Sequence, residues 1–103
     1  MGSLDRRKDT NFFQKYRVSS TSFEVLASWN FTSVGIALMV ESNNINDVIQ
    51  YSFDGTNVHG DMTPTLPSEA IIFDNRFANK IWFRRATPGD PVVVRVEAWR
   101  HMA

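Results

Sequence analysis

Apolar and polar residues alternate with a period of two over much of this chain, which is typical of β-strands that bury one face. The alternation is clearest in the segments 21–29, 79–85 and 91–99. In the last of these, PVVVRVEAW, the valines at even positions face one side, and Arg95 and Glu97 face the other. An amphipathic helix would instead repeat its apolar residues about every three to four positions. The pattern therefore predicts a β-rich fold.

Three further segments indicate strands, and turn-forming residues separate all of them. The segment 34–42, VGIALMVES, is apolar on both faces, as expected of a central strand, whereas 46–54 alternates and 69–74 is short. Glycine, proline, asparagine and aspartate gather between the strands, in ESNNIND, DGTN, TPTLPSE and TPGDP. We therefore predict an all-β fold, a small antiparallel β-sandwich or jelly-roll-like barrel of about six to eight strands.

The chain length fits one domain, and the alternating pattern begins only after its first residues. We predict a single β-sandwich domain over 15–103 and an N-terminal arm over 1–14. The arm is basic and carries Phe12 and Phe13, which could anchor it on a neighbouring molecule. The alternative is an arm without a specific contact.

Acidic and basic residues are segregated along the chain although the net charge is zero. Residues 1–17 carry a net charge of +3, residues 18–75 a net charge of −7 with no lysine or arginine, and residues 76–103 a net charge of +4. The pattern can be satisfied within one molecule, by pairing of the outer segments with the middle one. It can also produce acidic and basic patches that steer the assembly of copies.

The stretch DGTNVHGD contains His59 and Asp61, two residues apart and on one side of an extended segment. A zinc site needs three or four ligands, and the only other histidine is His101. The stretch also does not match the spacing of an EF-hand loop. Since Asp-Gly is a preferred hairpin turn, we predict a turn at Asp54-Gly55 and no metal or other cofactor.

No catalytic pattern is present, and we expect no enzymatic activity. The chain has no cysteine, no G-x-S-x-G segment and no glycine-rich phosphate loop. No apolar run approaches the roughly 20 residues of a membrane-spanning helix, so we expect no membrane partner. A nucleic-acid binder, such as a small barrel of the OB type, would carry a basic surface, and the zero net charge argues against one.

Two tryptophans are expected to face outward beside arginines. Trp82 alternates with Ile81 and Phe83, while Trp99 shares a face with Arg95. Outward tryptophans flanked by arginine are typical of interface hot spots. The predicted partner-facing residues are Phe12, Phe13, Trp82, Arg84, Arg95 and Trp99. An exposed aromatic row could alternatively bind sugar rings, so a carbohydrate-binding module or host-surface adhesin stays open.

The second half of the chain, from Ile49 to Trp99, resembles small structural proteins of tailed-bacteriophage virions. The resemblance is carried, in order, by IQYSFDGTNVHGDM, IIFDNRFANKIWFRR and PVVVRVEAW. It implies a non-enzymatic β-sandwich of the virion, present in many copies as a capsid decoration (cement) protein or as a head–tail or tail accessory. Its partners would be other copies of itself and other virion proteins. The resemblance marks a fold and assigns no functional residues.

Overall fold

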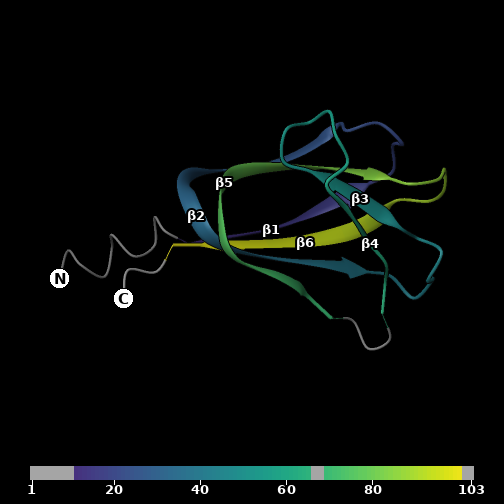
Figure 1. Cartoon of the computed structure of the whole chain (residues 1–103). Coiled ribbons are helices and arrows are strands. Elements are labelled where there is room, and N and C mark those ends of the chain that lie inside the picture. The colour runs from purple at the N-terminus through teal and green to yellow at the C-terminus, as the bar shows by residue number, and fades with distance from the viewer. Residues whose placement is uncertain (1–10, 66–68, 101–103) are drawn as a thin grey trace.

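The computed structural model describes residues 11–65 and 69–100, and these form one antiparallel sheet of six strands (Figure 1). The order across the sheet is β1-β6-β2-β5-β3-β4, and the described residues contain no helix. The all-β prediction is therefore confirmed. The strands are β1 (Asn11–Val18), β2 (Val25–Glu41), β3 (Ile49–Ser52), β4 (Gly60–Met62), β5 (Ile71–Arg85) and β6 (Val92–Trp99).

Strands β2 and β5 are 17 and 15 residues long, and the paired strands bend together at one end of the molecule (Figure 1). The first part of β2 pairs with the last part of β5, and the register shifts twice between Ser28 and Gly35. Beyond the shifts, β2 pairs with the start of β5 on one side and with β6 on the other. The sequence predicts two separate strands for each of these elements, and that prediction is wrong.

The bend divides the sheet into two parts, which we call the β1 half and the β3 half. The β1 half contains β1, β6, residues 35–41 of β2 and residues 71–74 of β5. The β3 half contains β3, β4, residues 25–28 of β2 and residues 80–85 of β5. Figure 1 shows the two halves running back over one another from the bend.

Buried side chains from both halves form one hydrophobic cluster. Phe12 of β1 lies 5.2 Å from Trp29 of β2, ring centre to ring centre, and Tyr51 of β3 lies 5.5 Å from Phe73 of β5. The alternation in the sequence predicts the side that enters this core for β6 and for the second part of β5. The buried hydrophobic residues are Val18, Ala27, Trp29, Ile36, Leu38, Val40, Ile49, Met62, Ile81, Phe83, Val92, Val94, Val96 and Ala98.

At the bend, two side chains of β2 donate hydrogen bonds to backbone carbonyls of β5. The Ser33 hydroxyl donates to the carbonyl oxygen of Ala78 at 2.9 Å and to that of Arg76 at 3.3 Å, and the Trp29 indole nitrogen donates to Ala78 at 3.1 Å. The register shifts in this region interrupt the regular ladder, so side chains supply hydrogen bonds to the carbonyls there. Asn75, next to these residues, has φ of 63°, which asparagine tolerates better than most residues.

Replacement of Ser33 by alanine is expected to lower the free energy of unfolding by about 1–2 kcal/mol, because a fully buried hydrogen-bond donor to two carbonyls is lost. Urea unfolding at fixed protein concentration measures the loss. Ser28→Ala, on the exposed side of the same strand, is the matched control and should change stability by less than about 0.5 kcal/mol. Equal effects at the two positions would contradict this account of the bend.

The last residue of β5, Arg85, is buried and holds two loops in place. Its guanidinium donates to the Asp47 carboxylate at 3.0 Å and to the backbone carbonyls of Thr87 and Asp90 at 2.8 and 2.9 Å. Gly89 lies against the guanidinium so closely that a Cβ there would be 2.4 Å from Nη2. This arginine therefore connects the loops before β3 and before β6.

Residues 11–14, which the sequence places in an N-terminal arm, belong to β1 and pair with β6. Positions 1–10 of that arm lie outside the described residues. Strand β1 was not expected, because only NFF stands out in its sequence. One side of β1 becomes buried only when the strand pairs with β6.

Candidate interaction surface

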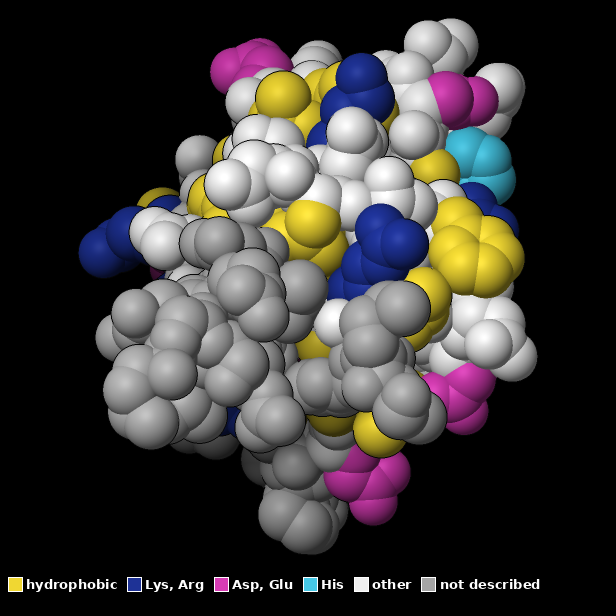
Figure 2. All heavy atoms as spheres, turned by 90° about the vertical axis from the view of Figure 1, so that its left-hand side faces the viewer, with side chains coloured by type: hydrophobic (Ala, Val, Ile, Leu, Met, Phe, Trp, Pro, Cys, Tyr) yellow, Lys and Arg dark blue, Asp and Glu magenta, His cyan; other side chains and the backbone are white. Residues whose placement is uncertain are grey.

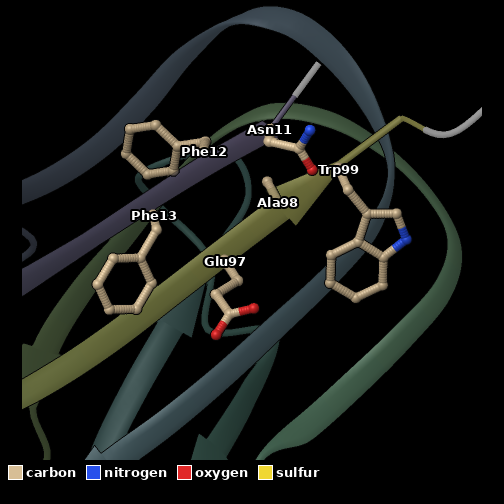
Figure 3. Close-up of a pocket in the computed structure, with 6 residues that line it drawn as sticks. All are labelled: Asn11, Phe12, Phe13, Glu97, Ala98 and Trp99. Atoms are coloured by element: carbon tan, nitrogen blue, oxygen red, sulfur yellow. The ribbon is translucent and has the colours of Figure 1, made fainter. Parts of the chain in front are cut away.

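The outer side of the β1 half is a broad surface built from four strands, which we call the outer face. Cross-strand register and burial assign its side chains, because residues opposite one another in neighbouring strands point to the same side. Figure 3 shows this at one end, where Phe13, Glu97 and Trp99 lie on one side of β1 and β6, and Phe12 and Ala98 lie on the other. The outer face comprises Asn11, Phe13, Lys15, Arg17, Gly35, Ala37, Met39, Glu41, Ile72, Asp74, Val93, Arg95, Glu97 and Trp99.

Each of the four strands contributes apolar side chains to this face. Phe13, Glu97, Ala37 and Ile72 form one cross-strand row, and its two ends, Phe13 and Ile72, are 55% and 60% exposed. Met39 and Trp99 add half-buried apolar area in the neighbouring rows. A sheet face that stays in water normally carries polar residues at these positions. The outer face thus combines exposed apolar side chains with charged ones.

Trp99 lies across the backbone of β2. An ideal Cβ on Gly35, its cross-strand neighbour, would come within 2.2 Å of the Trp99 indole, so only glycine leaves room for the ring in this position. The indole is held against the sheet and forms part of the floor of the outer face. A shallow depression of about 510 Å³ lies beside it, lined by Asn11, Phe12, Phe13, Glu97, Ala98 and Trp99 (Figure 3).

Ion pairs connect the strands of the outer face. Glu41 lies 3.4 Å from Lys15 and 3.9 Å from Arg95, and Arg95 also lies 3.9 Å from Glu97. The Arg95 guanidinium stands 5.8 Å from the centre of the Phe13 ring. These exposed pairs contribute little to stability individually. They do show that basic residues from both ends of the sequence pair with an acid of the middle segment.

The structure brings three of the six predicted partner-facing residues together. Phe13, Arg95 and Trp99 lie on the outer face, whereas Phe12 packs inward against Trp29. Trp82 and Arg84 lie elsewhere, on the outer side of the β3 half.

On the β3 half, the outward direction of Trp82 is as predicted, but the ring is covered by its own chain. A Cβ on Gly55 would lie 3.0 Å from the indole, and the Lys80 ammonium is 5.3 Å from the ring centre. Arg84 donates to the side chain of Gln50 at 2.8 Å and lies 4.4 Å from the centre of the Phe23 ring. These two residues therefore make local contacts.

Sequence reasoning missed Ala37, Met39 and Ile72 as members of the outer face. Ala37 and Met39 could have been found from the sequence, because the segment 34–42 is apolar on both sides. Strands of this kind are normally covered on both faces. The exposure of Ile72 depends on the bend in β5, which the sequence does not indicate.

Residues 53–59, which include Asp54-Gly55, form the loop between β3 and β4, and the chain turns there as predicted. The Asp54 carboxylate accepts hydrogen bonds from the backbone N–H groups of Thr56 and Asn57, both at 2.8 Å, and Gly55 has φ of 80°. The His59 Nδ1 accepts from the backbone N–H of Phe53 at 3.0 Å, so this nitrogen is engaged within the loop. Gly60 and Asp61 are not part of this loop, because they belong to β4. Within the described residues, no group of three potential ligands could hold a metal ion.

Two aspartates are held in their charged form by hydrogen bonds. The backbone N–H of Asn57 is the main cause that lowers the pKa of Asp54, and the Ser42 hydroxyl, followed by Arg85, lowers the pKa of Asp47. A carboxylate with a lowered folded-state pKa stabilises the protein above its ordinary pKa of 3.8, and this contribution is lost as the pH falls below that value.

The free energy of unfolding is therefore expected to fall between about pH 5 and about pH 2, since the unfolded state binds more protons there. Urea titrations across this range measure the slope. Asp54→Asn should flatten it by removing one of the two groups, while Asp74→Asn, on the outer face, serves as the charge-matched control. An unchanged slope in Asp54→Asn would contradict the role given to Asp54.

Comparison with known proteins adds no assignment: neither the family models nor the curated proteins searched contain a match to this chain. In the part of the chain that the structure describes, no helix is long and apolar enough to cross a membrane. Figure 2, which views the end of the molecule where β2 and β5 bend, shows hydrophobic side chains lying beside lysine and arginine.

Proposed function

We propose that this chain is a non-enzymatic structural subunit of a tailed-bacteriophage virion, acting through protein–protein contacts as a capsid decoration protein or as a head–tail or tail accessory. The observation that carries the proposal is the outer face, where exposed Phe13 and Ile72 and half-buried Trp99 lie among charged residues. An apolar surface with interspersed charges suits a subunit that binds neighbours. The resemblance of residues 49–99 to phage virion proteins supplies the biological setting.

We also propose that the bent sheet functions as a small β-sandwich. The single hydrophobic cluster, with Phe12 and Trp29 at one place and Tyr51 and Phe73 at another, supports a packing of the two halves against each other. The outer sides of both halves are then left for contacts with other molecules.

The carbohydrate-binding alternative has less support from the side chains. Trp82, the outward tryptophan of the β3 half, lies beneath Gly55 and beside Lys80. A flat and accessible indole is needed to stack on a sugar ring, and loop 53–59 occupies that side. We therefore favour the structural role.

The direct test uses a phage whose genome encodes this chain. Its particles are purified through a density gradient, the chain is quantified by mass spectrometry, and its position is located by immunogold electron microscopy. We expect several copies per particle and labelling at one defined part of the virion. A replication protein from the same phage serves as the control for contamination. Absence of the chain from purified particles would overturn the proposal.

A further inference from the structure

We propose that the outer face binds the outer face of a second copy of this chain, with the strands of the two copies antiparallel. The inference rests on the proposed function, because it specifies one contact of the assembling subunit. Two sheets that pack face to face commonly keep their strands nearly aligned, so each strand of the β1 half would lie over its own equivalent.

The charges of the outer face are divided along the strand direction, and this division selects a second copy as the occupant. One end carries Glu97 and Asp74, a net charge of −2. The other end carries three basic residues against one acid, a net charge of +2: Lys15, Arg17 and Arg95 with Glu41. A face with opposite charges at its two ends is complementary to itself when one copy is turned end to end.

A two-fold axis across the strands, between the row of Phe13 and the row of Lys15, produces this arrangement. It places Glu97 opposite Arg95 of the second copy, and Arg95 opposite Glu97 of that copy. It also places Phe13 opposite Lys15 of the second copy, where a cation can lie over an aromatic ring. Each of these contacts occurs twice because the interface is symmetric.

The apolar centre of the face fits the same arrangement. Ala37 and Met39 occupy successive outward positions of β2, so the axis places the small side chain of one copy opposite the large one of the other. Methionine is flexible and fills the irregular space between two sheets well. The apolar contacts of β2 would then lie beside the ion pairs of β6, and interfaces commonly contain both kinds of contact.

The other two-fold arrangement, with the axis along the strands, fits less well. With that axis between β6 and β2, Glu97 would lie opposite Ala37 of the second copy and Arg95 opposite Met39 of that copy. Both charges would then lose water without gaining an opposite charge across the interface, and this is unfavourable. The charge pattern therefore favours the antiparallel stacking.

Two charge-reversal variants of the full chain test the contact by sedimentation velocity, from low micromolar to near-millimolar concentration. Glu97→Arg gives a face with arginine at both 95 and 97, and Arg95→Glu gives a face with glutamate at both. We expect wild type to dimerise and each variant alone to weaken dimerisation by about tenfold or more. An equimolar mixture should dimerise again, since each arginine then meets a glutamate.

The control carries a charge reversal of the same size on the β3 half, Arg84→Glu, and should dimerise like wild type. Circular dichroism of every variant verifies the fold. The proposal is overturned if wild type is monomeric throughout, if the two variants dimerise normally, or if their mixture stays monomeric. A chain that is found in phage particles but is monomeric contradicts only this interface. A chain that dimerises as expected but is absent from particles contradicts only the virion role.

Discussion

Trp29→Ala is expected to lower the free energy of unfolding by about 3–5 kcal/mol, the usual loss when a large aromatic is removed from a core. Trp29 is buried, lies 5.2 Å from Phe12 and 6.4 Å from Phe31, and donates its indole hydrogen to Ala78. The substitution removes the ring that joins β1 to the bend of β2. A domain of this size has little stability to spare, so the variant should be largely unfolded at physiological temperature.

Two further tryptophan variants make this result specific, with urea unfolding as the measurement. Trp29→Phe keeps an aromatic ring but loses the hydrogen bond to Ala78, and about 1–2 kcal/mol should be lost. Trp82→Ala removes a half-buried ring on the β3 half, and the loss should be smaller than that of Trp29→Ala. If Trp82→Ala proved the more damaging change, the assignment of inner and outer sides would be wrong.

Arg85→Met should lower the free energy of unfolding by about 3 kcal/mol, at the lower end of the range for breaking a buried ion pair, because Asp47 keeps some access to water. The substitution keeps much of the side-chain length but leaves the carboxylate of Asp47 and the carbonyls of Thr87 and Asp90 without this donor. Both loops that the guanidinium holds should loosen, and hydrogen exchange should report this as faster exchange in residues 42–48 and 86–91.

The adjacent arginine provides the matched control for this variant. Arg84 points to the opposite side of β5, where it contacts Gln50 and Phe23 at the surface. Arg84→Met should therefore cost less than about 1 kcal/mol and leave exchange in the two loops unchanged. Equal losses at the two positions would contradict the conclusion that Arg85 holds the two loops in place.

Alternation in the sequence was sufficient to predict which residues face inward on β6 and on the second part of β5. Val94 and Phe83 are buried as expected, and the central position of 34–42 in the sheet is also correct. The inward side follows from the period of the strand, and the central position follows from apolar residues on both faces. The buried side of such a strand could therefore be predicted without knowing which strands lie beside it.

The bend could not be predicted in the same way. In the sequence, the residues between 29 and 34 separate two predicted strands and resemble a loop. In the structure, side-chain hydrogen bonds from Trp29 and Ser33 to β5 keep the strand continuous there. These bonds join residues 45 and 49 positions apart in the sequence, so they exist only once β5 lies alongside. Strand β1 was missed for the same reason, since β6 gives it a buried side.

The candidate surface was predicted in part. An outward Trp99 beside Arg95 follows from alternation, but their meeting with Phe13 and Ile72 depends on the strand order β1-β6-β2-β5. Trp82 illustrates the opposite case. Its outward direction was correct, yet Gly55 in the neighbouring loop covers the ring, and no local pattern in the sequence indicates that contact.

The central claim, that the outer face is a protein interface, is tested most directly by the absolute mass of the full chain from light scattering across a wide range of concentration. We expect wild type to approach twice 11.8 kDa as the concentration rises. Ile72→Ser should stay at 11.8 kDa, whereas Leu26→Ser, an exposed leucine on the β3 half, should behave like wild type. A wild-type mass of 11.8 kDa at every concentration, or a dimer that Ile72→Ser leaves intact, would contradict the claim.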